Sequence, residues 1–453
     1  SAMEPLKLDR VPQQTLSDSH QLLRGFTMNL FHLQHVELQG MRVTRRSFLR
    51  TISAGAAAAG LLGFRDWMTV HAEDLFRHDR ALILLYMAGG PSQFETFDPK
   101  PGTDNGGPTT AIDTAVPGIQ IAQHWPRVAQ AMGDIALIRS MTNKEGQHQR
   151  AAYQLHTGYL PSGSVKYPSL GCNLARELAD RSRDLPAVVS VGPSVGAGFL
   201  GVDYEPFVVQ NPGQLPQDVA SAVPVPRFER RLGLLGRLEN DFAERGGEQA
   251  VADHKVLYEK TRKLVLSPDV KAFNLSDEPK ELQDRYGDSQ FGRGCLLARR
   301  LVEAGVTFVE VTLNGWDTHD NNFERVKTLS GQADPAFAAL IEDLKARGRL
   351  DRTMVVWAGE FGRTPRVNPR NGRDHYPRVF NAAIAGGGVR GGQVIGASTK
   401  DGSGVDRDAV SIADLLTTVC KSMQVNPAKE NLSPLGRPIK IVDGGKPVDA
   451  LFG

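Results

Sequence analysis

The chain has 453 residues, of which 40% are hydrophobic and 23% are charged, an ordinary globular composition. This length suits one large domain or two to three smaller ones, and it can bury a sizeable core without disulfide staples. The net charge of +2 comes from 53 basic and 51 acidic residues. No global field therefore points to nucleic acid or to an anionic membrane, and we expect no nucleic-acid partner.

The three cysteines, Cys172, Cys295 and Cys420, are far apart and form no CxxC pair. This spacing argues against a zinc knuckle or a disulfide framework, although one disulfide could form. We expect three small buried apolar residues.

The N-terminal region divides into two parts. Residues 1–3 (SAM) resemble a cloning scar, and residues 4–40 are an upstream segment of uncertain origin without clear periodicity. Residues 41–72 are typical of a twin-arginine signal peptide: residues 44–50 read TRRSFLR, a short apolar run follows, and residues 70–72 (VHA) fit a cleavage site. The alternative is a chance Arg-Arg pair before an alanine-rich helix.

The signal predicts export of the folded chain by the Tat translocase to a periplasmic or extracellular location. The apolar run is too short and too weakly hydrophobic to span a membrane, so we expect no membrane span in the mature form. Cleavage would leave Glu73 as the first residue. Export in the folded state is compatible with a metal or cofactor loaded before transport.

The remaining chain, residues 73–453, alternates strand and helix patterns. Apolar runs that end in glycine or turn residues predict five strands, at 81–87, 185–191, 306–313, 353–357 and 380–385. Amphipathic spacing predicts helices at 169–181, 291–304, 335–347 and 411–423, the last opened by a Ser411/Asp414 capping box. This alternation predicts an α/β fold with a mostly parallel sheet and helices on both faces.

Residues 225–288 differ from the rest, because they are charged and helical with no strand signal. They are interpreted as an inserted helical subdomain or lid, or equally as a plain helical hairpin packed on the core.

Polar clusters follow the predicted strands, where ligands bind in open α/β sheets. Asp317 and His319 follow the strand at 306–313, and Glu360 and Arg363 follow the strand at 353–357. Carboxylate–imidazole sets suit zinc or manganese, whereas sets richer in carboxylates suit calcium or magnesium. A nearby guanidinium suits a tetrahedral oxyanion. Each cluster alone is also compatible with a hydrogen-bonded loop.

Several enzyme classes lack support in the sequence. No Gly-x-Ser-x-Gly elbow precedes a helix, no Walker loop is present, and the glycine-rich run at 386–392 lacks the Rossmann spacing.

Five segments together resemble one family: 87–92 (MAGGPS), 96–101 (TFDPKP), 316–319 (WDTH), 359–365 (GEFGRTP) and 372–377 (GRDHYP). It is the domain of unknown function 1501 family, a sulfatase-like branch of the alkaline phosphatase superfamily. The resemblance covers roughly residues 41–440. It implies a mostly parallel central sheet flanked by helices, one or two divalent metals at the strand ends, and hydrolysis or transfer of phosphate or sulfate esters.

The metal ligands that the resemblance implies are Asp317, His319, Glu360 and His375, with Asp374 as a neighbour. The match is incomplete, because Phe361 stands where the superfamily has a second histidine. The superfamily's first metal aspartate falls near Ala88 or Gly89 and is missing. The residues that could substitute for it are Ser92, Glu95 and Asp98.

The nucleophile position also departs from the superfamily. Sulfatases place a modifiable cysteine nine residues before a Thr-Gly pair, and nine residues before Thr157 stands His148. A formylglycine sulfatase is therefore not expected. His148 is a candidate nucleophile, base or ligand, and Thr142 is a weaker nucleophile candidate.

Two functions compete at this stage. The first is a metal-dependent hydrolase of phosphate or sulfate esters on a small molecule or glycan, with Asp317, His319, Glu360 and His375 holding zinc, manganese, calcium or magnesium. In it His148 attacks or moves a proton and Arg363 binds the oxyanion. The second is a non-catalytic sulfatase-like protein that binds a glycan or a protein partner. Unrelated chemistry on the same fold, such as a mutase or phosphonate-processing reaction, is the remaining alternative.

Overall fold

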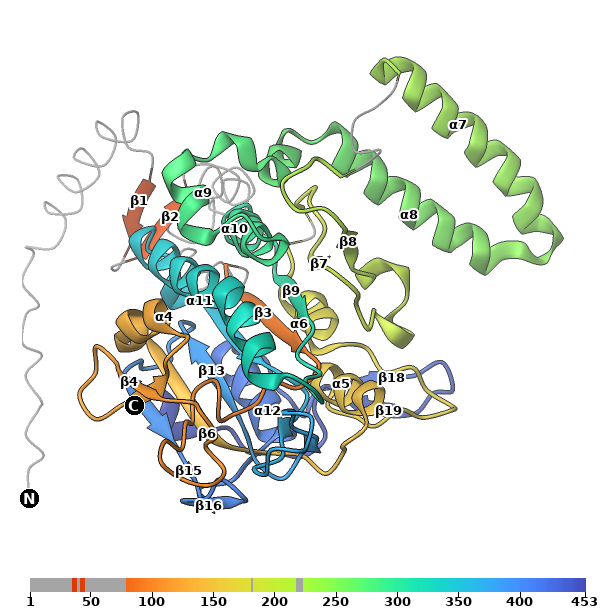
Figure 1. Ribbon diagram of the computed structural model, residues 1–453. Helices are drawn as coiled ribbons and strands as arrows, with labels where there is room; N and C mark the ends of the chain where they lie inside the picture. The colour runs from red at the N-terminus through yellow and green to blue at the C-terminus, as the bar shows by residue number, and fades with distance from the viewer. Residues whose placement is uncertain (1–34, 39–40, 45–78, 181, 217–222) are drawn as a thin grey trace, which may run out of the picture. The chain divides into compact units, whose positions relative to one another are not determined.

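The computed structural model describes residues 35–38, 41–44, 79–180, 182–216 and 223–453 (Figure 1). The chain divides into two units, residues 1–75 and 76–453, each considered by itself. In the first, strand β1 (His35–Leu38) pairs antiparallel with β2 (Met41–Thr44). Most of the predicted signal peptide, including its arginine pair, lies outside the described residues. No helix in the described ranges has the length and apolar character needed to cross a membrane.

A nine-stranded sheet forms the centre of the second unit. Its order is β14-β6-β13-β10-β3-β9-β7-β8, with β17 added on β6. All neighbours are parallel except β13, which runs antiparallel to both β10 and β6. The strands are β3 (Ala81–Ala88), β6 (Ile135–Thr142), β7 (Val188–Val191), β8 (Phe207–Val209), β9 (Phe308–Asn314), β10 (Thr353–Ala358), β13 (Phe380–Ala385), β14 (Gln393–Ile395) and β17 (Val410–Ser411).

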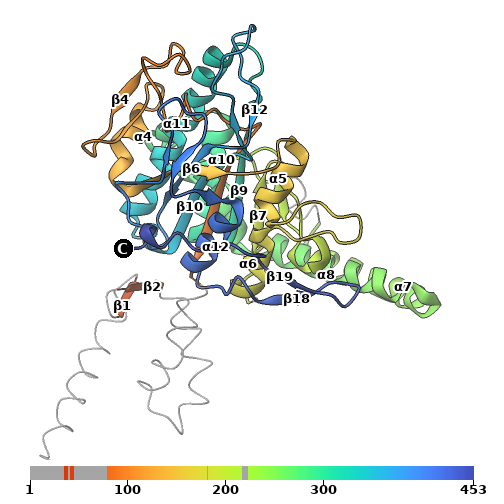
Figure 2. The same ribbon diagram turned by 90° about the horizontal axis from the view of Figure 1, so that it is seen from below.

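Helices cover both faces of this sheet, as the α/β pattern predicts (Figure 2). On β3, Ile83 and Leu85 face one core, and Leu82 faces the other. The first core is closed by α4 (Pro126–Ala131), α10 (Gln290–Glu303) and α11 (Asn322–Ala346). The second is closed by α5 (His148–Thr157), α6 (Leu170–Leu178) and α12 (Ile412–Ser422). The predicted mostly parallel sheet between helical layers is confirmed.

Helix starts agree with their predicted caps, with one exception. Ser169 caps α6, and Ser411 and Asp414 form the capping box of α12. The helix predicted to start at Pro335 instead begins at Asn322 and runs through that proline. Proline is favoured at a helix start because the first N–H groups of a helix have no partner within the helix. In α11 the missing N–H of Pro335 is tolerated inside the helix instead. The neighbouring Asp334 carboxylate accepts the backbone N–H groups that open α4.

Residues 225–288 contain helices and no strand. They comprise α7 (Val225–Phe242), a π-helical turn (Ala243–Gly247), α8 (Glu248–Leu266), two short 3₁₀ turns (Pro268–Phe273 and Leu275–Asp277) and α9 (Lys280–Tyr286). Helices α7 and α8 form a hairpin that projects from the sheet in both views (Figures 1 and 2).

Short two-stranded hairpins lie outside the central sheet. They are β4 (Ala111–Asp113) with β5 (Gln120–Ala122), β11 (Gly362–Arg363) with β12 (His375–Tyr376), β15 (Ala397–Ser398) with β16 (Val405–Arg407), and β18 (Glu430–Leu432) with β19 (Pro438–Lys440). The three cysteines are free and buried, as predicted.

Candidate metal centre

The loop after β9 brings Asp317 to the carboxyl edge of the sheet, beside the end of β3. The backbone N–H of Trp316 donates to the carbonyl of Ala88 over 3.2 Å. Gly89 has a φ of +116°, and a Cβ there would lie 2.4 Å from the backbone nitrogen of Asp317. Glycine is therefore required for this close approach. Any side chain on residue 89, a carboxylate included, would meet the same backbone atoms.

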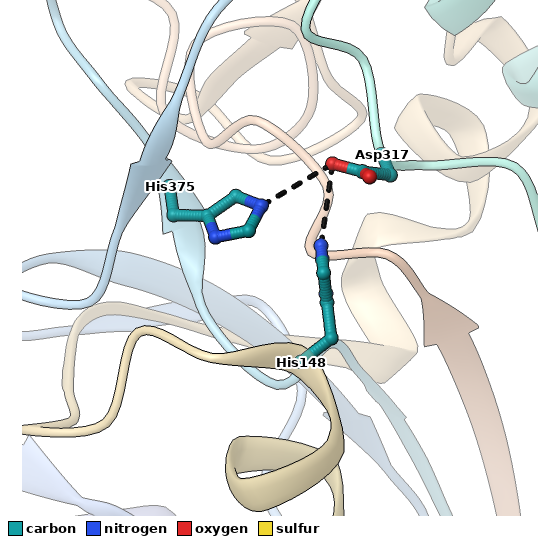
Figure 3. Close-up of side chains that lie close together, drawn as sticks. All are labelled: His148, Asp317 and His375. Carbon is teal, nitrogen blue, oxygen red and sulfur yellow. Dashed lines mark hydrogen bonds and ion pairs between the residues drawn. The ribbon is translucent and has the colours of Figure 1, made fainter.

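Three imidazoles surround one oxygen of Asp317. The Nε2 atoms of His319, His148 and His375 lie 3.1, 3.2 and 3.4 Å from Oδ1 of Asp317. The Nε2 atoms of His319 and His375 are 2.9 Å apart. Figure 3 shows His148 and His375 pointing toward Asp317 from two different elements. The ligand atoms of His148, Asp317 and His375 all lie within 4.8 Å of one another.

The fold explains why residues so distant in sequence meet here. His148 is the first residue of α5, directly after the loop from β6, and Asp317 follows β9. His375 belongs to β12, which precedes β13. Because β13 is antiparallel, its start rather than its end lies at the carboxyl edge of the parallel strands. All three residues therefore reach the same edge of the sheet.

Each imidazole is held through its other ring nitrogen. The Nδ1 atoms of His148, His319 and His375 lie 2.7, 2.7 and 2.8 Å from Glu360 Oε1, Asp374 Oδ1 and the carbonyl oxygen of Gly146. These oxygens accept, so each Nδ1 carries the hydrogen and a neutral ring presents a lone pair at Nε2. Three lone pairs then face one carboxylate oxygen, which is repulsive unless a proton or a cation lies between them.

The Nε2 atom of His148 is one of the three ring nitrogens that face Asp317. It is buried and has no hydrogen-bond partner, although Asp317 Oδ1 lies within ion-pair distance. Burial lowers the pKa of His148, but the carboxylates of Glu360 and Asp317 outweigh it and raise the pKa above its usual value. Burial and the neighbouring cations lower the pKa of His375.

Arg363 forms a hydrogen-bonded ion pair with Asp317. Its side chain is fully buried, and its Nη2 donates to Asp317 Oδ1 over 2.7 Å. Its other N–H groups donate to the carbonyl oxygens of Gly89, Gly90 and Arg373. Burial raises the pKa of Asp317, but the hydrogen bond and charge of Arg363 outweigh it and lower the pKa to about 2. Arg363 thus fixes an ionised ligand. Its burial argues against the sequence-based role of oxyanion binding.

Glu360 lies behind His148 rather than among the ligand atoms. Its Oε1 accepts from the Gly89 N–H over 3.0 Å as well as from His148, and its Oε2 accepts from the hydroxyl of Tyr86 over 3.1 Å. Both oxygens are engaged and the side chain is 1% exposed. Asp374 has the equivalent place behind His319, although it is half-exposed. These contacts favour an orienting role for Glu360 and Asp374 over the metal-ligand role predicted from the sequence.

The remaining sequence candidates lie elsewhere. The hydroxyl of Thr142 donates to the carbonyl of Val410 over 3.5 Å. Glu95 is paired with the buried Arg373 over 2.8 Å, and Asp98 with Lys100 over 2.9 Å. Ser92 is fully buried without a hydrogen-bond partner for its hydroxyl. None of the described contacts of these residues places them in the cluster, so none substitutes for the missing first ligand.

Sequence reasoning missed three contributors: Tyr86, the carbonyl of Gly146 and Gly89. In the sequence, Tyr86 is one residue of a predicted buried strand. The carbonyl of Gly146 belongs to the backbone, which has no sequence signature. The doublet Gly89-Gly90 after the strand was visible, and a glycine with positive φ at a strand end is the signal of a close backbone approach.

The fold and the cluster together define an α/β protein with a candidate centre of three histidines and one aspartate. The chain belongs to a family described as protein of unknown function (DUF1501), whose model matches residues 79–452. The membership expected from the motifs is confirmed. No curated protein sequence matches the chain.

Solved structures give only distant likenesses. The lipoteichoic acid synthase LtaP from Listeria monocytogenes has 11% identity and a TM-score of 0.38, over 81% of this chain and 75% of that one. A putative sulfatase from Bacteroides thetaiotaomicron has 10% identity and a TM-score of 0.41, over 82% and 74%. The phosphonate monoester hydrolase of Agrobacterium radiobacter has 13% identity and a TM-score of 0.32, over 82% and 77%. Scores this low say nothing about the reaction of this chain.

Proposed function

We propose that the chain is an exported, metal-dependent hydrolase of phosphate or sulfate esters. His148, Asp317, His319 and His375 would hold one divalent cation. The observation that carries the proposal is the convergence of three Nε2 atoms on one carboxylate oxygen, with every Nδ1 facing an acceptor. Glu360 and Asp374 complete the carboxylate–histidine pairs that accompany protein metal sites.

The donor set favours zinc among the four candidate metals. Three neutral imidazoles and one carboxylate suit zinc or manganese better than calcium or magnesium, which take oxygen ligands. With zinc–ligand bonds of about 2.0–2.2 Å, the ligands of a tetrahedral site lie about 3.3–3.6 Å apart. The three Nε2–Oδ1 separations and the His319–His375 separation, 2.9–3.4 Å, would need a small outward movement to reach those values. The ligand atoms of His148 and His375 lie within 4.8 Å of one another.

A divalent cation held here would polarise an ester oxygen and lower the pKa of a bound water molecule. The protein side chains prepare the site for that chemistry. Glu360, Asp374 and the Gly146 carbonyl fix the orientation and tautomer of the three rings. Arg363 keeps Asp317 ionised. The side chain of Asp317 is 46% exposed, so an ester borne on a small molecule or a glycan can reach it from solvent.

The placement of His148 favours a ligand over a nucleophile. Its Nδ1 is bound to Glu360, and its Nε2 faces the oxygen that the other two imidazoles also face. Phe361 occupies the place of the superfamily's second histidine, and its ring packs 4.8 Å from the ring of His148 and 4.7 Å from that of His375. Among the described residues, no hydroxyl or thiol is hydrogen-bonded to the side chains of His148, Asp317, His319 or His375. This last observation favours the second candidate, a non-catalytic protein that binds a glycan or a protein partner through the same metal.

Metal analysis and turnover together test both candidates. Wild-type protein, purified without chelator, is compared with Asp317→Asn and with Asp320→Asn, which alters an exposed carboxylate of the same loop. We expect about one zinc ion per chain and hydrolysis of an aryl phosphate or aryl sulfate, both lost in Asp317→Asn alone. Wild-type protein that binds no divalent ion contradicts the metal centre. Bound metal without turnover on a panel of such esters supports the non-catalytic alternative.

A further inference from the structure

The α7–α8 hairpin carries an apolar row that nothing in the described chain covers. Leu234, Leu238 and Phe242 are spaced four residues apart on α7 and are 59%, 62% and 58% exposed. Residues four apart share one face of a helix. Burying the side chain of a leucine is favourable by about 1.5–3 kcal/mol, so three exposed large apolar residues in one row are a surface that selects a partner.

Leu234 and Leu238 of this row point away from α8, whereas the ring of Phe242 lies against Gly247 at the turn between the two helices. The contacts between the two helices use other positions of α7: Glu239 lies 3.3 Å from His254, and Asn240 accepts from Lys255 over 2.9 Å. On a helix with 3.6 residues per turn, Leu234 and Leu238 lie across the axis from this pair. The hairpin projects from the sheet in both views, so a second helix can lie along this face (Figures 1 and 2).

The charges of α7 are complementary to those of the same helix turned end to end. Residues 225–232 hold three arginines and one glutamate, and residues 237–242 hold one arginine and two acidic residues. The N-terminal part of α7 therefore has a net charge of +2 and its C-terminal part a net charge of −1. Two copies placed antiparallel, with Leu234 of one beside Leu238 of the other, bring each basic half against an acidic half. A two-fold axis requires such a self-complementary patch.

We propose that the outward face of α7 is a dimer interface, and that its occupant is the α7 of a second copy of this chain. The two hairpins would then pack as an antiparallel four-helix bundle with a central apolar seam. The antiparallel charge match distinguishes this occupant from an anionic membrane, because the acidic half of the helix would be repelled by anionic lipid.

Analytical ultracentrifugation of the full chain tests the interface. We expect wild-type protein to be a dimer, and the double variant Leu234→Glu/Leu238→Glu to be a folded monomer with its dissociation constant raised at least about 100-fold. The control is Leu432→Glu/Leu435→Glu, which changes two leucines that are 71% and 68% exposed at the β18–β19 hairpin and should leave the dimer intact. Circular dichroism and the melting temperature check that both variants fold.

Salt provides a second readout, because the paired charges lie near the surface. We expect the dimer to weaken by about tenfold or more between low salt and about 0.5 M salt. A wild-type chain that remains monomeric at about 100 µM overturns the proposal. So does a dimer that survives the α7 double variant. Binding of wild-type protein to anionic phospholipid vesicles that is lost in the same variant would assign the face to a membrane instead.

Discussion

Gly89 and Asp317 approach so closely that a Cβ on residue 89 would lie 2.4 Å from the backbone nitrogen of Asp317. The end of β3 is thus closed by the loop that carries the candidate ligand. The guanidinium of Arg363 fills the adjacent space, donating to Asp317 and to the carbonyl of Gly89. The fixed positive charge of Arg363 beside Asp317 would disfavour a second divalent cation at the proposed centre.

Gly89→Ala is expected to disrupt this centre. The new Cβ meets backbone atoms that cannot move freely, and the φ of +116° disfavours any side chain. We expect a loss of stability of about 2–5 kcal/mol and a metal affinity reduced by at least tenfold. Gly102→Ala is the control, because Gly102 also has a positive φ, +74°, but open space around its Cβ. Urea unfolding and zinc titration measure both effects, and equal losses in the two variants would contradict the account.

Glu360→Gln should weaken metal binding with little change in the ligand atoms themselves. Glutamine keeps the shape of the side chain but loses the charge that orients His148 over 2.7 Å. Removal of such an outer partner typically costs 10–100-fold in metal affinity. Asp374→Asn provides a comparison, because Asp374 is 53% exposed and water can replace it behind His319. Competition with a fluorescent zinc chelator should show the larger loss for Glu360→Gln.

The rule that ligands bind beyond the carboxyl ends of parallel strands predicted which loops lie together, but it did not separate candidate ligands from orienting residues. Asp317 and His319 follow one buried strand, and Glu360 and Arg363 follow another. Because the carboxyl ends of parallel strands share one edge, the meeting of these two loops was predictable from sequence. His375 was expected there only from the resemblance. Its physical reason is the antiparallel direction of β13, which depends on pairing between distant strands and leaves no local signal. The same reversal places the glycine run at 386–388 at the opposite edge, away from the site.

The distinction between ligand and orienting residue was also beyond the sequence. Glu360 follows its strand as Asp317 does, and composition cannot show that its oxygens already serve Gly89, Tyr86 and His148. Likewise, an arginine on a glycine-rich turn gives no indication that its side chain is buried. Arg363 is buried among three carbonyl oxygens, two from the adjacent residues Gly89 and Gly90 and one from Arg373.

Metal affinity is expected to rise with pH. The pKa of His148 lies above its usual value in the metal-free chain, so a proton competes with the metal for Nε2 up to and beyond pH 6.5. The affinity should increase by up to about tenfold per pH unit until this proton has left. Zinc titrations from about pH 5.5 to pH 9 measure the slope. A flat profile between pH 6 and pH 7 would show that His148 is not a ligand.

The stability of the metal-free chain has the opposite dependence. A folded-state pKa above the unfolded value stabilises the fold below the unfolded pKa, and this contribution disappears as pH rises through the folded value. The part contributed by His148 is therefore fully present below about pH 6.5 and is lost above it. Melting temperatures of chelator-treated protein should fall with rising pH in that window, and the fall should be smaller in His148→Gln.

Glu310→Gln should destabilise the core without removing metal binding. Glu310 on β9 and His156 on α5 form a pair 3.0 Å apart, and both side chains are at most 4% exposed. Burial lowers the pKa of His156, but Glu310 outweighs it and raises the pKa. Breaking a buried pair on one side leaves the other charge unpaired, which costs about 3–5 kcal/mol. Urea unfolding of both single variants and of Glu310→Gln/His156→Gln gives the coupling free energy, and simple additivity would contradict a coupled pair.

The proposed export signal can be tested independently of the proposed metal centre. Arg45→Lys/Arg46→Lys should leave an unprocessed chain in the cytoplasm, because the twin-arginine route selects the paired guanidinium groups and a lysine presents a different donor geometry. Arg50→Lys, which changes a third arginine of the same segment, is the control and should be exported normally. Mass spectrometry of the exported protein should identify Glu73 as its first residue. Export of the double variant at the wild-type level would instead favour the chance Arg-Arg pair and a route of export that does not read these arginines.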